Sequence, residues 1–227
     1  MRRVRVLLCG ALVMTTACAG GMPASQKSVP EHEAAAKANA EIAVAHDRAE
    51  QEAPPCADMN DIYEICWTRS DTAQEHRFQA QQHRRRAAEH RAASEALRTA
   101  ESEACAGVSA VDRDISPFLH SGDIVGAELL DPADTESRET TPVVRVTFRP
   151  VPGLDEGTLK RLIGCHLARN ASLGHEVPEM EFCPLVPPGV EASVGKADDN
   201  LFVIIAAHES TFDEVRRRAL TLVERAQ

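Results

Sequence analysis

The sequence predicts an α+β protein: an N-terminal helical hairpin or stalk, then a small antiparallel four-stranded sheet with two helices, in the order strand-strand-helix twice. Two observations favour this class. Residues 31–106 are rich in alanine and in charged residues, with strong helix formers throughout. Residues 107–227 instead switch between stretches rich in valine and isoleucine, as in strands, and segments of helical period.

The alanine-rich part is expected to form two antiparallel helices, over residues 31–53 and 71–104, with a Pro-Pro pair ending the first. Cys56 and Cys66 enclose nine residues between the helices, so a Cys56–Cys66 disulfide is expected to close the tip. The apolar stripe of this hairpin is thin, and consists of Ile42, Val44, Phe78 and Leu97. The hairpin is therefore either a pairing surface for another chain or a solvated spacer.

The second part supplies four strands and two helices. The expected strands are residues 123–130, 142–149, 189–195 and 201–207, and the expected helices are 154–171 and a C-terminal helix from Ser210. One antiparallel sheet with both helices on one face would bury these patterns in a single core. The inner order of strand, helix, strand, strand and helix is shared with ferredoxin-like folds, which implies nothing about function.

The chain begins with the layout of a secretory signal: three arginines, a short apolar run from Val6 to Met14, and three small residues. The sequence Thr15-Thr-Ala-Cys18 resembles the lipobox of bacterial lipoproteins, with Thr15 where that family usually has Leu, Val or Ile. The resemblance implies that residues 1–17 are removed and that Cys18 is lipidated, so that residues 18–30 form a lipidated tether. Because Ala19 and not Asp follows Cys18, it also implies an outer-membrane location. Cleavage after Ala19 would instead leave a soluble periplasmic or secreted protein.

Charge and motifs narrow the class of function. The formal charge is −10, and removal of the three signal arginines leaves 22 − 35 = −13. A chain this acidic is a poor partner for nucleic acid, whose phosphates need a basic face. The sequence has no Gly-x-Ser-x-Gly elbow, phosphate-binding glycine loop or Cys-x-x-Cys pair, and this favours a non-enzymatic protein.

Thiols and imidazoles are the candidate functional groups of the second part. The set consists of Cys105, His120, Cys165, His166, His175 and Cys183, which are ligand types that zinc and copper prefer. The preferred interpretation is a Cys165–Cys183 disulfide that pins the long loop after the helix. A metal site formed by this set, and a link from Cys105 to this part of the chain, are the alternatives.

Three histidines, His76, His83 and His90, recur every seven residues in the second helix. A spacing of seven places neighbours about 10 Å apart, so one ion cannot bridge them. The period indicates a coiled-coil register, with the histidines on a solvated polar face that becomes charged as the pH falls. The neighbouring run Arg84-Arg85-Arg86 is interpreted as a solvated face as well.

Four short stretches, Cys105-Ala-Gly, Ser116-Pro-Phe-Leu-His120, Cys165-His-Leu-Ala and Cys183-Pro-Leu, resemble those of uncharacterised lipoproteins from proteobacteria such as myxobacteria. That resemblance implies no activity. The expected function is a non-enzymatic interaction or structural module of the cell envelope, without a cofactor. Its partners would be the membrane, through the anchor, and either another envelope protein or a second copy bound through the stalk. The alternative is a periplasmic copper- or zinc-binding protein.

Overall fold

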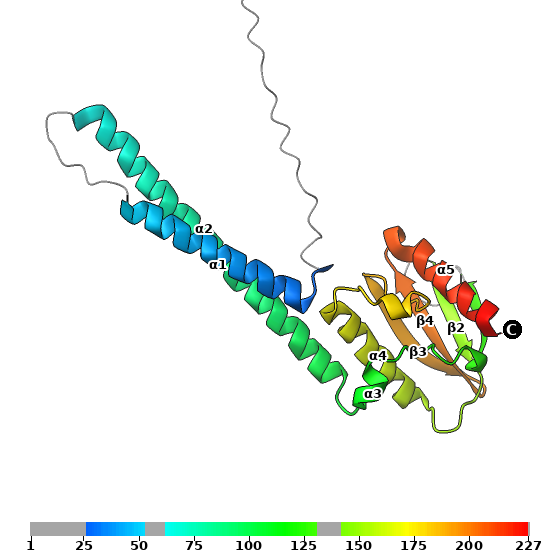
Figure 1. The fold of residues 1–227 in the computed structure, drawn as a ribbon. Coiled ribbons are helices and arrows are strands. Elements are labelled where there is room, and N and C mark those ends of the chain that lie inside the picture. Colours follow the sequence, from blue (N-terminus) through cyan, green and yellow to red (C-terminus); the bar gives the residue numbers. More distant parts are fainter. Residues whose placement is uncertain (1–25, 53–61, 131–141, 227) are drawn as a thin grey trace, which may run out of the picture.

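The computed structural model describes residues 26–52, 62–130 and 142–226, with the backbone alone over 62–71 and at 226. It confirms the α+β class: a long helical hairpin, α1 (Val29–Glu52) and α2 (Ile62–Ala104), projects from a domain built on one antiparallel sheet (Figure 1). The free ends of the two helices lie far from the sheet, and the start of α1 and the end of α2 lie beside it.

The hairpin begins with a capping box. The backbone N–H of Ser28 donates to the Glu31 carboxylate at 2.7 Å, and the backbone N–H of Glu31 donates to the Ser28 hydroxyl at 3.3 Å. The predicted start of the second helix was wrong, because α2 begins at Ile62 and not at residue 71. Cys66 therefore lies within the helix and not in a loop. The predicted Cys56–Cys66 disulfide falls on two side chains that lie outside the described part of the chain.

Small side chains form the seam between α1 and α2. The small buried residues there are Ala36 and Ala43 of α1 and Ala80, Ala87 and Ser94 of α2, and His32 of α1 is buried beside them. The predicted apolar stripe was wrong in this respect, because Ile42, Val44 and Phe78 are 41–57% exposed. Small residues let two helix backbones approach closely, so this seam depends on close packing and on the polar contacts described below more than on burial of large side chains.

The sheet has the strand order β1-β2-β4-β3, and every neighbouring pair is antiparallel. Its strands are β1 (Ile124–Leu130), β2 (Val143–Phe148), β3 (Val190–Ala197) and β4 (Asn200–Ala207). Two helices, α4 (Glu156–Ser172) and α5 (Glu209–Ala226), cover one face, as predicted. Since β4 lies between β2 and β3, the segment β2-α4-β3 is a split β-α-β unit.

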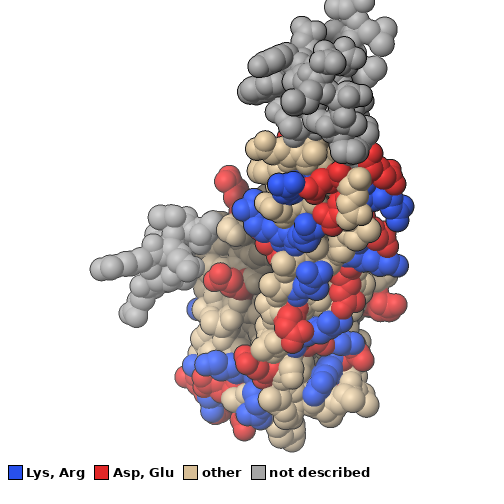
Figure 2. Space-filling view, turned by 90° about the vertical axis from the view of Figure 1, so that its left-hand side faces the viewer, with Lys and Arg blue, Asp and Glu red and all other residues tan. Residues whose placement is uncertain are grey.

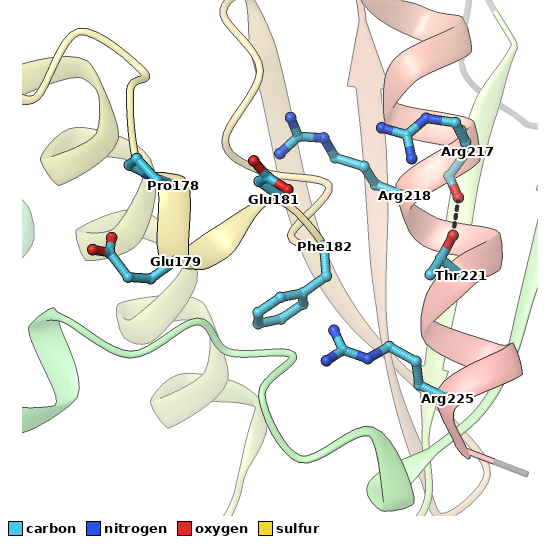
Figure 3. A pocket seen from close by; sticks show the side chains of 8 residues that line it. All are labelled: Pro178, Glu179, Glu181, Phe182, Arg217, Arg218, Thr221 and Arg225. Atoms are coloured by element: carbon cyan, nitrogen blue, oxygen red, sulfur yellow. Dashed lines mark hydrogen bonds between the residues drawn. The ribbon is translucent and has the colours of Figure 1, made fainter.

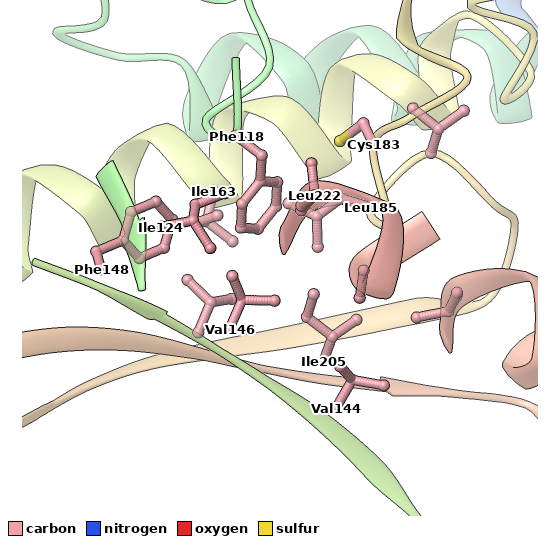
Figure 4. Close-up of a cluster of buried hydrophobic side chains, with 14 of the residues drawn as sticks. Phe118, Ile124, Val144, Val146, Phe148, Ile163, Cys183, Leu185, Ile205 and Leu222 are labelled. Carbon is pink, nitrogen blue, oxygen red and sulfur yellow. The ribbon is translucent and has the colours of Figure 1, made fainter. Parts of the chain in front are cut away.

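One core fills the space between the sheet and these helices (Figure 4). Alternate residues of the two central strands point into it, namely Val144, Val146 and Phe148 of β2 and Leu201, Val203 and Ile205 of β4. Leu159 and Ile163 of α4 and Leu222 of α5 meet them from the helix side. Phe118 stacks on Phe148 with 5.6 Å between ring centroids. The period-two pattern of the strands thus accounts for the face that is buried.

The last two turns of α2 pack against α4. Going along α4, the contacts are a Cys165–Cys105 disulfide, an ion pair from Arg169 to Glu101 at 2.7 Å, and a hydrogen bond from Ser172 to the Leu97 carbonyl at 3.3 Å. These positions advance by three or four residues on α4 and by four on α2, in opposite directions, as expected for one face of each of two antiparallel helices. Arg169 also pairs with Asp114 at 2.5 Å, just after the short helix α3 (Ala110–Arg113). The end of α2 therefore packs against the α+β domain, on the other side of the boundary predicted at residue 106.

Candidate functional site

The structure separates the six predicted thiol and imidazole residues. Cys105 and Cys165 form a disulfide, so the predicted Cys165–Cys183 pairing is wrong and the alternative, a link from Cys105 to this part of the chain, is confirmed. The physical reason is the docking of α2 on α4, which brings the end of α2 to the outward side of α4. Cys165 faces that side and forms a small cluster with Cys105 and Val108, whereas Cys183 belongs to the main core.

Cys183 is instead a free, fully buried thiol beside His166. The loop after α4 does fold back as predicted, and it brings the Cys183 Sγ to 3.3 Å from the His166 Nε2. Burial lowers the pKa of His166 to about 4 and raises the pKa of Cys183 to about 11, the latter in spite of a hydrogen bond from Ser116 that acts in the opposite direction. A nucleophilic cysteine requires a thiolate, which a partner imidazolium stabilises. Here both groups stay neutral near pH 7 and out of solvent, so the pair serves the packing of the loop.

The two remaining histidines of the set are occupied or distant. His175, at a positive φ of 63° after Gly174, has its Nδ1 2.8 Å from the carbonyl oxygen of Val186, and so helps to close the same loop. His120 lies at an apolar cavity of about 240 Å³ with Leu154 and Leu162 on its wall. In the described part of the chain, no group of three or more His, Cys, Asp or Glu side chains is arranged to hold a metal ion. The predicted six-residue metal site is therefore not assembled.

A groove on the α+β domain lies between α5 and the short helix η4 (Pro178–Met180), with a volume of about 370 Å³ (Figure 3). Its lining residues are Pro178, Glu179, Glu181 and Phe182 on one side and Arg217, Arg218, Thr221 and Arg225 on the other. Sequence reasoning missed this groove. Its one signal was the arginine spacing on the last helix, and the loop that forms the opposite wall has no pattern of its own.

The three arginines of the groove differ in how they are held. Arg218 donates to Glu214 at 2.7 Å and to the Cys183 carbonyl at 3.2 Å, so it ties the loop to α5. Arg217 forms a two-pronged pair with the same Glu214, which lowers the pKa of that carboxyl. The Arg225 guanidinium stacks over the Phe182 ring, 4.8 Å from its centroid, and no carboxylate in the described ranges pairs with it. Arg225 is thus the arginine that is available to an anionic group.

The seven-spaced histidines of α2 form the second candidate site. The predicted register is confirmed, but the predicted solvated face is wrong, because these side chains point at α1. The His90 Nδ1 lies 3.0 Å from His32 Nδ1, His83 Nδ1 lies 2.8 Å from the Asn39 oxygen, and His76 Nδ1 lies 3.1 Å from His46 Nδ1. Each pair of residue numbers adds to 122, as an antiparallel register requires. The sequence did contain this signal, since His32, Asn39 and His46 also recur every seven residues.

Ion pairs cross the hairpin beside these histidines. Arg84 forms a two-pronged contact with Asp47, Arg77 pairs with Glu50 at 2.7 Å, and Arg98 pairs with Glu33. The sequence predicted that Arg84 belongs to a solvated arginine run, and this prediction was wrong for Arg84 because it pairs with Asp47. On the face seen in Figure 2, positive and negative side chains are interspersed and no broad area of one sign forms. Exposed ion pairs between long side chains each add little to the free energy of unfolding. Their main effect here is therefore to fix the register of α1 against α2, and they contribute little to the stability of the hairpin.

Acidification is expected to loosen the hairpin. Burial, and then the neighbouring His32, lower the pKa of His90 below its ordinary value. A lowered pKa means that the folded hairpin disfavours the proton, so its stability is present above pH 6.5 and is lost as the pH falls through the folded pKa. A His90→Asn variant, followed by the thermal unfolding of its helices between pH 7 and pH 5, should depend less on pH than the parent does. An equal pH dependence in both would contradict this assignment.

None of the helices in the described part of the chain has both the length and the apolar character needed to cross a bilayer. Comparison with protein-family models, with curated proteins and with solved structures finds no match to this chain.

Proposed function

We propose that the chain is a non-enzymatic lipoprotein of the outer membrane, which presents its α+β domain to another protein of the cell envelope. The observation that carries the proposal is the contact between α2 and α4. A disulfide, an ion pair and a hydrogen bond join the two helices over three successive positions. A flexible linker would let the domain turn freely, whereas this contact fixes its orientation with respect to the stalk.

The start of the chain supports the anchored end of this arrangement. The signal-like residues 1–17 and Cys18 precede α1, and the start of α1 lies beside the α+β domain (Figure 1). In this proposal the lipid at Cys18 holds that end near the membrane, through a short tether. Mass spectrometry of the mature N-terminus tests this part by itself: a diacylated Cys18 is expected, and an unmodified chain that starts at Gly20 would refute the anchor.

The groove between η4 and α5 is the surface that we assign to the partner. It combines an apolar wall, Phe182, with the unpaired guanidinium of Arg225. An apolar anchor next to a charged group is a common arrangement for recognition of a protein segment. The partner segment would carry a carboxylate for Arg225, because a guanidinium binds a carboxylate through two parallel hydrogen bonds. Its apolar side chain would lie against Phe182.

Site-specific photo-crosslinking in native membranes tests this assignment. A photoreactive residue in place of Thr221, inside the groove, should give a discrete adduct with an envelope protein. The same residue in place of Glu191, exposed on β3, is the matched control and should give none. The Thr221 adduct should also disappear when Arg225→Glu is added. An adduct from Glu191 but not from Thr221, or one that Arg225→Glu leaves unchanged, would refute the groove as the docking surface.

A further inference from the structure

The hairpin holds a second kind of site, which goes beyond the proposed docking function. The Nδ1 atoms of His46 and His76 lie 3.1 Å apart across the seam, and their ring centroids are 5.4 Å apart. The His83 ring stacks on His46 with 5.8 Å between centroids. Three imidazoles from two helices therefore meet in the part of the hairpin between the middle of α2 and the last turns of α1.

The separation of the two Nδ1 atoms fits a metal ion. Imidazole nitrogen binds zinc at about 2.0–2.1 Å, so two such ligands at ordinary angles of coordination lie roughly 2.9–3.4 Å apart. The observed 3.1 Å falls in this range. Without an ion, one imidazole must donate its Nδ1–H to the other. If that proton moves to Nε2 of the same ring, both Nδ1 atoms become free as ligands, with no net loss of a proton.

The surroundings neither repel nor enclose a cation. Two ion pairs cross the hairpin in this region, Asp47 with Arg84 and Glu50 with Arg77, and each is neutral as a pair. His46 and His76 are both half-buried, so water can fill the remaining positions around an ion. We propose that His46 and His76 bind one borderline divalent ion, Zn²⁺ or Cu²⁺, per chain, and that this ion joins the outer part of α1 to α2.

The other histidine pair does not meet these conditions. His32 is only 3% exposed, so the space around the His32–His90 contact leaves little room for the water ligands that a site with two protein ligands needs. His83, through Nδ1, is bonded to Asn39 and acts as a wall of the proposed site.

Metal binding to the whole mature protein tests the proposal. The chain is exported with its own signal segment, purified in detergent through a tag that lacks histidine, and dialysed against ZnCl₂ or CuCl₂. One ion per chain is expected, with a rise in the unfolding temperature of the helices. His76→Ala and His46→Ala should each raise the dissociation constant more than about tenfold, because each removes one of two protein ligands. His90→Ala, in the same helix and the same register, is the matched control and should bind like the parent.

Circular dichroism of each metal-free variant shows whether its helices are intact, and two independent variants guard against a failure of either one to fold. With Cu²⁺, electron paramagnetic resonance should show coupling to two nitrogens in the parent and fewer in His76→Ala. Unchanged affinity in both His46→Ala and His76→Ala would overturn the proposal. Loss of binding in His90→Ala to the same extent would overturn it as well. Neither result would bear on the groove between η4 and α5.

Discussion

Replacing Cys105 and Cys165 together by serine should lower the free energy of unfolding by about 4 kcal/mol. The two cysteines are 60 residues apart in sequence, and the disulfide removes the freedom of that whole segment from the unfolded chain. The segment includes β1 and β2, and β2 must pair with β4, which is distant in sequence. The cross-link therefore reduces the conformational freedom of the unfolded chain in a part that forms long-range strand pairs. In the folded state, the variant would also lose the side-chain cross-link between the end of α2 and α4.

Denaturant unfolding of the oxidised parent and the double variant measures this difference. Cys183→Ala is the matched control, since it also removes a buried sulfur but should leave the disulfide intact. Thiol counting in denaturant then distinguishes the two: Cys183→Ala should lose one free thiol relative to the parent. If Cys165 were joined to Cys183, Cys183→Ala would release a thiol and the count would not fall. A loss below about 1 kcal/mol in the double variant would show that the docking of α2 on α4 holds the two parts together without the cross-link.

The secondary structure of the α+β part was predictable because its patterns are strong. The alternation in Val144, Val146 and Phe148, with polar residues between, specifies a half-buried strand. The predicted strands and helices all occur within about two residues of their observed bounds, a margin expected at the ends of elements. The placement of α4 and α5 on the same face of the sheet was also predictable, since each helix has one apolar face and the sheet has one fully buried face.

The partners of the cysteines were not predictable in this way. A Cys165–Cys183 disulfide follows from the long loop after the helix folding back onto that helix, and this leaves the packing of the hairpin out of account. The observed Cys105–Cys165 disulfide depends on the packing of α2 against α4. In the sequence, this packing is indicated only by a matched spacing of three or four residues, in Leu97, Glu101 and Cys105 on one side and Cys165, Arg169 and Ser172 on the other. The period of His76, His83 and His90 predicts a register for α2 alone. Its meaning required the matching positions of α1, which face it across the seam.

The second large effect is expected from pH, and comes from the buried His166–Cys183 pair. His166 has a pKa of about 4 in the folded protein, against 6.5 in the unfolded chain. As the pH falls from 6.5 to 4, His166 binds a proton in the unfolded chain but stays largely neutral in the folded protein. The free energy of unfolding therefore falls by roughly 3 kcal/mol over this range. At the alkaline end, Cys183 has a pKa of about 11 in the folded protein against 9.0 unfolded, so its contribution is lost as the pH rises from 9 to 11.

Two variants separate the two limbs of this curve when the free energy of unfolding is measured from pH 4 to pH 10.5. His166→Gln keeps a neutral polar side chain at the buried position, and should flatten the acidic limb relative to the parent. Cys183→Ala should flatten the alkaline limb and leave most of the acidic one. The slope is the decisive quantity, because either substitution can lower stability at every pH through imperfect packing. Parallel curves for His166→Gln and the parent would mean that the His166 imidazole accepts a proton in the folded protein, and so that it is not sealed in the core.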